Sequence, residues 1–230
     1  MTDLTHTKDR KREDFHALIV TGGDVDFTYR PEKGGLVVAV DGGLEAVRAM
    51  GLKPHVIIGD FDTIAPEILR EYEGEERIEM IRLSPMKDDT DTQAAVNLVL
   101  DRGYRKIDVL GATGSRFDHS FANMFLLKMA RKRGAEMTYY TPLSKIYLIS
   151  GTKEYRKEDF FGKYISFLQF DGSAKDVTLR GFAYEVEHFD FDTAKGYRLG
   201  VSNEPKEETA IVRIGKGFLL VVESKEDKNL

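Results

Sequence analysis

The fold is decided in the stretch LVVAVDGGLEAVRAMGLKPHVIIGDFDT, which covers residues 36–63. Two short apolar runs, Leu36–Val40 and Val56–Ile58, have the composition of buried strands. Between them, Leu44–Met50 has a helical pattern, and Gly51 follows in the usual position of a left-handed C-terminal cap. A helix between two apolar strands predicts a pair of parallel strands joined by a crossover helix.

The same alternation of strands and helices extends from this stretch in both directions. The helix expected after Thr90 carries a capping box, in which Thr90 is the N-cap and Gln93 reaches back to it. Strands that alternate with helices predict a parallel sheet with helices on both of its faces. Further strands are expected at Ala17–Val20, Ile78–Leu83, Lys106–Leu110 and Met137–Tyr140, and further helices from Pro66 to Glu71 and over His119–Arg133.

The pattern changes near Leu143, where alternating apolar runs and turn signals begin. Such short alternating runs predict an all-β domain, a small sandwich or barrel. We therefore expect an N-terminal α/β domain over residues 15–143, a C-terminal all-β domain over residues 144–230 and a flexible tail over residues 1–14. The runs are Tyr164–Phe170, Val177–Leu179, Ala210–Ile214 and Phe218–Val222, and the turn signals are Asp171-Gly172-Ser173 and Gly215-Lys216-Gly217.

The composition excludes several kinds of function. The 230-residue chain has no cysteine, which rules out disulfides, thiolate nucleophiles and cysteine metal sites and favours a reducing, cytoplasmic location. Its net charge of -5 argues against a broad nucleic-acid surface. Residues 1–14 lack the apolar core of a signal peptide, and no apolar run is long enough to cross a membrane.

The chemically unusual residues of the first half follow the ends of its predicted strands. Asp41 comes after one strand, and Asp60 and Asp62 come after the next. In an open parallel sheet, ligands bind in the crevice outside the carboxyl ends of the strands, so we expect these loops to meet along one rim. The other members of this rim are Lys87, Asp88, Asp89 and Asp91 before the capped helix, and Gly111, Arg116, Asp118 and His119 after a further strand.

The mixture of charges on this rim predicts its chemistry. Several carboxylates close together repel one another unless cations neutralise them, and Mg²⁺ uses one or two carboxylates together with substrate phosphates. Lys87 and Arg116 are suited to phosphate oxygens, and the glycines of residues 111–114 let the backbone approach a phosphate. Each piece has a structural alternative, because Thr63 could cap a helix, Asp89 could favour a helix dipole and a glycine pair is often a turn. Their joint occurrence at successive strand ends predicts metal-assisted phosphoryl chemistry.

Together these motifs resemble those of the thiamine pyrophosphokinase family. The resemblance spans almost the whole chain and implies an N-terminal α/β domain, a C-terminal β-sandwich and a homodimer. It also implies transfer of the terminal diphosphate of ATP to the hydroxyl of thiamine, which yields thiamine diphosphate and AMP. The stretches that carry it are Asp41-Gly42-Gly43, Gly59-Asp60-Phe61-Asp62-Thr63, Lys87-Asp88-Asp89-Thr90-Asp91, residues 111–119 running on to Asn123, and Ser202-Asn203-Glu204.

The resemblance further implies roles for individual residues. It makes Asp60, Asp62 and Asp91 ligands of Mg²⁺, and it places Asp41, Asp62 and Asp91 among the catalytic groups without deciding which is a general base. The chain departs from the family at Ser115, where a second glycine is common, and it has no tryptophan to stack on thiamine. Nucleotide and phosphate contacts are implied for Lys87, Asp88, Gly111, Arg116, Asp118 and His119, and thiamine contacts across the dimer for Ser202 and Asn203.

Two other functions fit part of the pattern. Residues 56–63 also resemble the Asp-x-Asp-x-Thr nucleophile loop of haloacid-dehalogenase-type phosphatases, in which Asp60 would take a phosphoryl group. That loop follows two other predicted strands, and the remaining acidic and glycine loops would go unexplained. A non-catalytic nucleotide or thiamine sensor would need fewer carboxylates. A P-loop kinase is excluded because the chain has no Gly-x-x-x-x-Gly-Lys-Ser/Thr motif.

Overall fold

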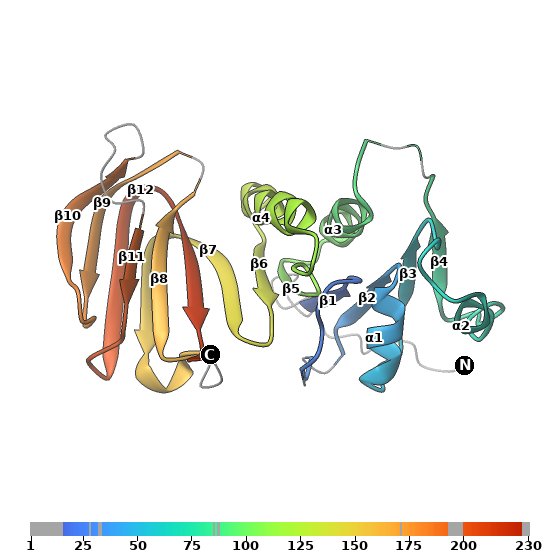
Figure 1. The fold of residues 1–230 in the computed structure, drawn as a ribbon. Helices are drawn as coiled ribbons and strands as arrows, with labels where there is room; N and C mark the ends of the chain where they lie inside the picture. Colours follow the sequence, from blue (N-terminus) through green and yellow to red (C-terminus); the bar gives the residue numbers. More distant parts are fainter. Residues whose placement is uncertain are drawn as a thin grey trace, which may run out of the picture.

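The computed structural model describes residues 16–27, 29–31, 34–84, 86, 88–170, 172–192 and 200–226. The expected tail over residues 1–14 and the expected phosphate contact Lys87 lie outside the described residues. The described chain forms a parallel sheet flanked by helices, followed by a strand-rich half (Figure 1). None of the described helices is long and apolar enough to cross a membrane.

Six parallel strands form the sheet of the first half, in the order β6-β5-β1-β2-β3-β4. The order reverses beside β1, whose neighbours are β5 and β2. The switch point at which such sheets bind ligands therefore lies at the carboxyl end of β1. The strands are β1 (His16–Val20), β2 (Leu36–Val40), β3 (Val56–Gly59), β4 (Glu79–Arg82), β5 (Lys106–Leu110) and β6 (Glu136–Tyr140).

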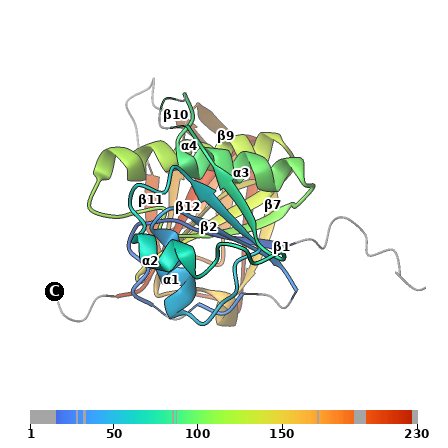
Figure 2. The ribbon, with the colours of Figure 1, turned by 90° about the vertical axis from the view of Figure 1, so that its right-hand side faces the viewer.

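The helices divide between the two faces of this sheet, which confirms the expected α/β arrangement. One face carries α1 (Gly43–Ala49) and α2 (Pro66–Arg70), and the other carries α3 (Asp91–Asp101) and α4 (Phe117–Lys132) side by side (Figures 1 and 2). Alternate residues of β1 enter different cores, because Leu18 packs in the core with α1 and Ile19 packs in the core with α3 and α4. Burial on both faces explains why the central strands are continuous apolar runs.

The N-terminus of α3 confirms only half of the expected capping box. The Thr90 hydroxyl accepts the backbone N–H of Gln93 at 3.1 Å. The Gln93 side-chain amide donates to the Asp89 carboxylate and, among the described residues, makes no bond back to Thr90. The prediction was wrong on this point because the carboxylate of Asp89 lies within reach of the Gln93 amide nitrogen, a donor that the capping-box pattern does not consider.

A pair of long antiparallel strands, β7 (Ser144–Arg156) and β12 (Thr209–Ser224), runs through the second half. A register shift between Ile214 and Leu219 bends β12, and Gly151 of β7, which pairs with Ile214, has a φ of +69°. The expected turn at residues 215–217 therefore lies inside one bent strand. The prediction of a turn between two strands was wrong because glycine is favoured both in turns and in bulges inside a strand. Only the pairing of β7 with both parts of β12 shows that the glycines form a bulge.

The bend lets β12 belong to two layers. Its first part pairs with β9 (Ser173–Arg180), which pairs in turn with β10 (Val186–Asp192). Its last part pairs with β8 (Tyr164–Gln169), which pairs with β11 (Gly200–Asn203). The layers enclose an apolar core of their own that includes Phe167. The strand-rich second half is thus confirmed, while β7 also pairs with β6, so the sheet continues across the expected boundary at residues 143 and 144.

Candidate active site

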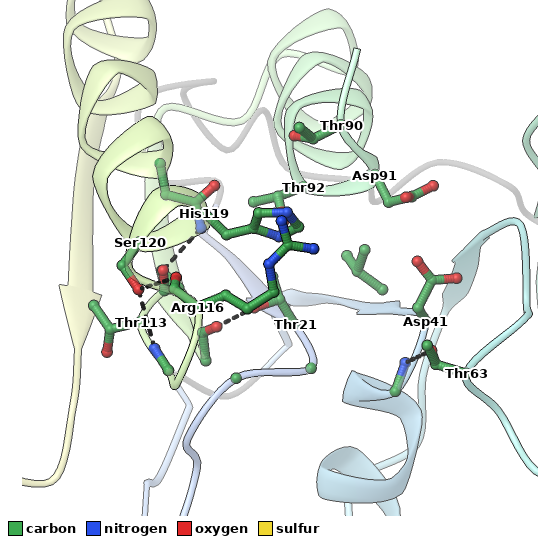
Figure 3. Close-up of a pocket in the computed structure, with 18 of the residues that line it drawn as sticks. Thr21, Asp41, Thr63, Thr90, Asp91, Thr92, Thr113, Arg116, His119 and Ser120 are labelled. Carbon is green, nitrogen blue, oxygen red and sulfur yellow. Dashed lines mark hydrogen bonds between the residues drawn. The ribbon is translucent and has the colours of Figure 1, made fainter. Parts of the chain in front are cut away.

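A cavity of about 700 Å³ opens at the carboxyl edge of the parallel sheet. Its walls are the loops that follow β1, β2, β3 and β5, together with the first turns of α3 and α4 (Figure 3). The cavity therefore lies at the switch point beside β1, where loops from both sides of the strand order meet.

Backbone contacts between the loops after β1 and β5 form part of the cavity wall. The Thr21 N–H donates to Leu110 O at 2.9 Å, and the Gly23 N–H donates to Gly111 O at 3.1 Å. A Cβ on Gly23 would lie 2.2 Å from the carbonyl oxygens of both Gly111 and Thr113. Only glycine allows the two loops to come this close.

The acidic side of the cavity joins the loops after β2 and β3. Asp41 Oδ1 accepts the backbone N–H of Phe61 at 3.1 Å, and Asp60 Oδ1 accepts that of Asp62 at 3.1 Å. Asp41 and Phe61 both have left-handed backbones, with φ values of 43° and 68°. Left-handed non-glycine residues are uncommon and mark positions that the surrounding structure over-determines. The Asp41 carboxylate is therefore held in a defined place.

The electrostatics of this side follow from burial and from like charges. Burial raises the pKa of Asp41 to about 6. The hydrogen bond from Phe61 lowers this pKa in part, and the negative charges of Asp91, Asp60 and Asp62 raise it further. Three carboxylates of the rim thus act on Asp41, as the sequence predicted for loops that meet, and a cation entering the cavity would relieve this repulsion.

These oxygen donors fit Mg²⁺. Among the described residues, no group of three or more acidic, histidine or cysteine side chains forms a metal cage by itself. Mg²⁺ seldom needs such a cage, because it keeps several waters and binds one or two carboxylates together with substrate phosphates. Such an ion would also neutralise the negative charges of Asp91, Asp60 and Asp62, which add to the effect of burial on the pKa of Asp41.

The basic side of the cavity lies at the start of α4. Arg116 and His119 line the cavity, whereas Asp118 does not. The Asp118 carboxylate accepts hydrogen bonds from Arg116 Nη2 at 2.5 Å and from Arg116 Nε at 3.3 Å. The Arg116 guanidinium holds the pKa of Asp118 below its usual range. The structure thus gives Asp118 a contact with Arg116 in place of one with the cavity.

The structure brings seven of the expected site residues around one cavity. Asp88 is not among the residues that line it, and Ser202 and Asn203 lie on β11 in the second half. Sequence reasoning missed the Thr21-Gly22-Gly23 loop, although this loop follows its strand just as residues 41–43 follow the next one. The seven residues are Asp41, Asp60, Asp62, Asp91, Gly111, Arg116 and His119.

Asn203 is buried, and its side chain is occupied by the protein itself. Its Oδ1 accepts the backbone N–H groups of Tyr184 at 2.9 Å and of Glu204 at 3.0 Å. Its Nδ2 donates to Tyr184 O at 2.7 Å, so one amide binds both polar groups of the Tyr184 main chain. The Tyr184 side chain remains 66% exposed. Asn203 therefore holds Tyr184 in place.

This fold and this site define a class of protein. It is an α/β protein in which a cavity with acidic and basic sides, suited to phosphoryl chemistry, lies at the carboxyl edge of a parallel sheet next to a strand-rich half.

Comparisons with known proteins identify the family. The catalytic-domain model of thiamin pyrophosphokinase matches residues 30–139, and the vitamin B1 binding-domain model of thiamin pyrophosphokinase matches residues 152–219. These two matches cover most of both halves of the chain. The chain belongs to the thiamin pyrophosphokinase family.

Individual relatives agree with this assignment. Over 212 residues the chain is 27% identical to a Bacillus subtilis protein named thiamine pyrophosphokinase, and the match covers 90% of this chain and 98% of the relative. The solved structure of thiamine pyrophosphokinase from Bacillus subtilis is similar with a TM-score of 0.82 and 26% identity, covering 92% of this chain and 100% of the other. A thiamin pyrophosphokinase family protein from Enterococcus faecalis is similar with a TM-score of 0.80 and 27% identity, covering 92% and 100%.

Proposed function

We propose that this protein transfers a diphosphate group from ATP to the hydroxyl of thiamine, giving thiamine diphosphate and AMP. One observation supports the proposal beyond family membership. Seven residues expected for this reaction, from four separate segments of the chain, surround one cavity of about 700 Å³. Carboxylates line one side of it and Arg116 and His119 the other, so the cavity suits an anionic nucleotide that arrives with a cation.

In the proposed reaction, the thiamine oxygen attacks the β-phosphorus of ATP in line. A bond forms between that oxygen and the β-phosphorus, the bond from the β-phosphorus to the oxygen bridging to the α-phosphate breaks, and AMP leaves with the bridging oxygen. Arg116 and His119 hold phosphate oxygens, and most of the acceleration comes from positioning and electrostatics. Asp41, Asp62 and Asp91 remain the candidates for accepting the hydroxyl proton.

We propose Asp60, Asp62 and Asp91 as the carboxylates that hold Mg²⁺, one or two for each ion, with Asp41 close by. When bound, the ion supplies positive charge that offsets both the carboxylates and the phosphates. The support for this assignment is that all four carboxylates lie at one cavity, where burial first and the charges of Asp91, Asp60 and Asp62 second raise the pKa of Asp41.

The second half supplies the thiamine contacts in this proposal. Ser202 is proposed to contact thiamine directly. For Asn203 we propose an indirect role, because its amide is used to hold the main chain of Tyr184. The exposed Tyr184 ring then offers a face for the cationic thiazolium ring in a chain without tryptophan.

This assignment is tested by a matched pair of substitutions. Tyr184→Phe keeps the ring and should leave the KM for thiamine within about twofold, whereas Tyr184→Leu should raise it about fivefold, since a cation–π contact contributes about 1 kcal/mol. Asn203→Ala should resemble Tyr184→Leu. Equal thiamine KM values for the phenylalanine and leucine variants would show that the Tyr184 ring does not contact thiamine.

We propose that the protein is a homodimer, and a row of aromatic side chains on α4 supports this. Phe117, Phe121 and Phe125 are 78%, 53% and 45% exposed, and successive ring centroids lie 6.1 and 5.4 Å apart. Phe170, which directly follows β8, continues the row, with its ring centroid 5.3 Å from that of Phe125. Contiguous exposed aromatic surface is typical of protein interfaces. Phe121→Lys should give a monomer by sedimentation, while the control Ile211→Lys, at another exposed apolar position, should not.

The reaction is tested by measuring AMP release from ATP and Mg²⁺ with and without thiamine. Thiamine-dependent AMP with an equal amount of thiamine diphosphate is the expected result, and a chelator should abolish both. Orthophosphate released from simple esters without thiamine would favour a phosphatase instead. Binding of ATP or thiamine without AMP would favour a sensor. A cytoplasmic location is proposed from the cysteine-free composition.

A further inference from the structure

The loop of residues 111–116 connects β5 to α4 and forms one wall of the cavity. The loop after β1 binds two of its carbonyl groups, since Gly111 O accepts the Gly23 N–H at 3.1 Å and Thr113 O accepts the Asp24 N–H at 2.9 Å. The carbonyl between them, Ala112 O, is bound from the other side by α4. The conformation of the loop is therefore imposed by its neighbours.

The side chain of Asn123 supplies the bond from α4. Its Nδ2 donates to Ala112 O at 2.8 Å, and the side chain is buried against the cavity wall. The Asn123 backbone is anchored in turn, because the fully buried Tyr139 hydroxyl donates to Asn123 O at 2.5 Å. Asn123 thus joins helix α4 to the loop through its side chain and, separately, to strand β6 through its backbone carbonyl.

A second residue of α4 closes the other end of the loop. Ser120 Oγ accepts the Gly114 N–H at 3.1 Å and donates to Arg116 O at 3.1 Å. A hydroxyl has one proton and two lone pairs, so it can make both bonds at once. Figure 3 shows Ser120 close to Thr113 and Arg116, with dashed lines for the hydrogen bonds of its hydroxyl.

These contacts determine which backbone N–H and carbonyl groups of the loop can face the cavity. In a trans peptide the carbonyl of one residue points opposite to the N–H of the next, so the bond to Ala112 O also fixes the direction of the Thr113 N–H. If the Ala112–Thr113 peptide were free to turn over, its negative carbonyl end could replace its positive N–H end. Oriented N–H groups bind phosphates, and a carbonyl turned toward them repels them.

We propose that Asn123 and Ser120 are positioning residues that hold the 111–116 loop in the shape that receives the phosphates of the nucleotide. They act through the loop backbone, and the proposal rests on the proposed reaction with ATP. Asn123→Asp should be more harmful than Asn123→Ala, because a carboxylate cannot donate to Ala112 O and repels both that carbonyl and the phosphates.

The test measures the dissociation constant of Mg·ATP by calorimetry alongside the kinetics of the reaction. Asn123→Ala should weaken Mg·ATP binding about tenfold, the equivalent of about 1.4 kcal/mol, with the KM for thiamine unchanged. Asn123→Asp should weaken it further. The matched control is Tyr139→Phe, which removes a buried hydrogen bond to the same residue but leaves the bond to the loop in place. Its melting temperature should fall, and its Mg·ATP affinity should stay within about twofold of the original.

A second pair of variants keeps the test decisive if the Asn123 variants do not fold. Ser120→Ala should weaken Mg·ATP binding about fivefold, and Ser120→Thr, which retains the hydroxyl, should restore it. Unchanged Mg·ATP affinity in the alanine variants, or an equal loss in Tyr139→Phe, would overturn the positioning role. A protein that shows these affinity changes but makes no thiamine diphosphate would overturn the proposed reaction and leave the role of the loop standing.

Discussion

Gly59, the last residue of β3, is the position at which a single added methyl group should damage the acidic side most directly. Its φ is +154°, and a Cβ built there would lie 1.7 Å from Asp41 Oδ1 and 2.4 Å from Asp41 Cγ. Real Cβ atoms essentially never approach another heavy atom closer than 3.0 Å, so the Asp41 carboxylate must move by more than 1 Å in Gly59→Ala. That movement also breaks its hydrogen bond with the Phe61 N–H.

The magnitude follows from these two effects. Backbone strain at a glycine-only φ costs about 1–3 kcal/mol, and the lost bond to a half-exposed carboxylate costs about 1 kcal/mol. For a chain of this size, a loss of about 2–4 kcal/mol lowers the melting temperature by roughly 5–15 °C. A displacement of about 1 Å in a positioned group is expected to lower kcat about 10²-fold.

The assay is thiamine-dependent AMP formation at saturating substrates, together with thermal unfolding. Gly51→Ala is the matched control, because Gly51 also has a positive φ of +67° but nothing lies within 4 Å of its added Cβ. This control should lose about 1 kcal/mol of stability and keep its kcat. A Gly59→Ala protein with normal kcat, or a Gly51→Ala protein with an equal loss, would refute the reasoning.

Three further predictions concern other charged groups. Asp62→Asn should lower kcat by about 10²-fold with the melting temperature nearly unchanged, and normal turnover would exclude Asp62 from the reaction. The folded-state pKa of Asp41, about 6, lies above its ordinary value of 3.8, so its stabilising contribution is full below pH 3.8 and is lost as the pH rises to 6. With a chelator present, the melting temperature of Asp41→Asn should therefore depend less on pH between these values than that of the unsubstituted protein. The same pH dependence in both proteins would contradict this. Glu223→Ala should lower the free energy of unfolding in urea by about 2 kcal/mol, because it removes the acceptor of the Phe161 N–H and leaves the buried Tyr147 hydroxyl, among the described residues, with only the Tyr155 hydroxyl, 3.3 Å away. A change below about 1 kcal/mol would refute this.

Much of the first half could be predicted because strand and helix patterns depend on neighbours only a few positions away. The apolar runs Leu36–Val40 and Val56–Ile58 became β2 and β3, and Gly51 follows α1 with a positive φ. The acidic rim was predictable for the same reason, because parallel strands place their carboxyl ends on one edge of the sheet. Asp41 and Asp60 needed only to follow such strands to meet there.

The predictions that failed concern partners that lie elsewhere in the structure. Gln93 bonds to Asp89, where the pattern indicated Thr90. The glycines at residues 215 and 217 bend one strand, because β7 pairs with β12 on both sides of them. The same residue types would occur at these positions if Gln93 bonded to Thr90 or if residues 215–217 formed a turn. The local pattern therefore could not distinguish the observed structure from the predicted one.

By itself, the sequence determined the alternation of strands and helices, the strand-rich second half and the carboxylates that gather at one edge of a parallel sheet. Only the tertiary structure decided that Thr21 bonds to Leu110, that Asn123 binds the carbonyl of Ala112 and that Asn203 holds Tyr184. The reason is a difference in precision. Apolar periodicity survives shifts of an ångström or more, whereas a hydrogen bond requires its two atoms within about 3 Å at a restricted angle, and only the packing of complete elements sets that distance.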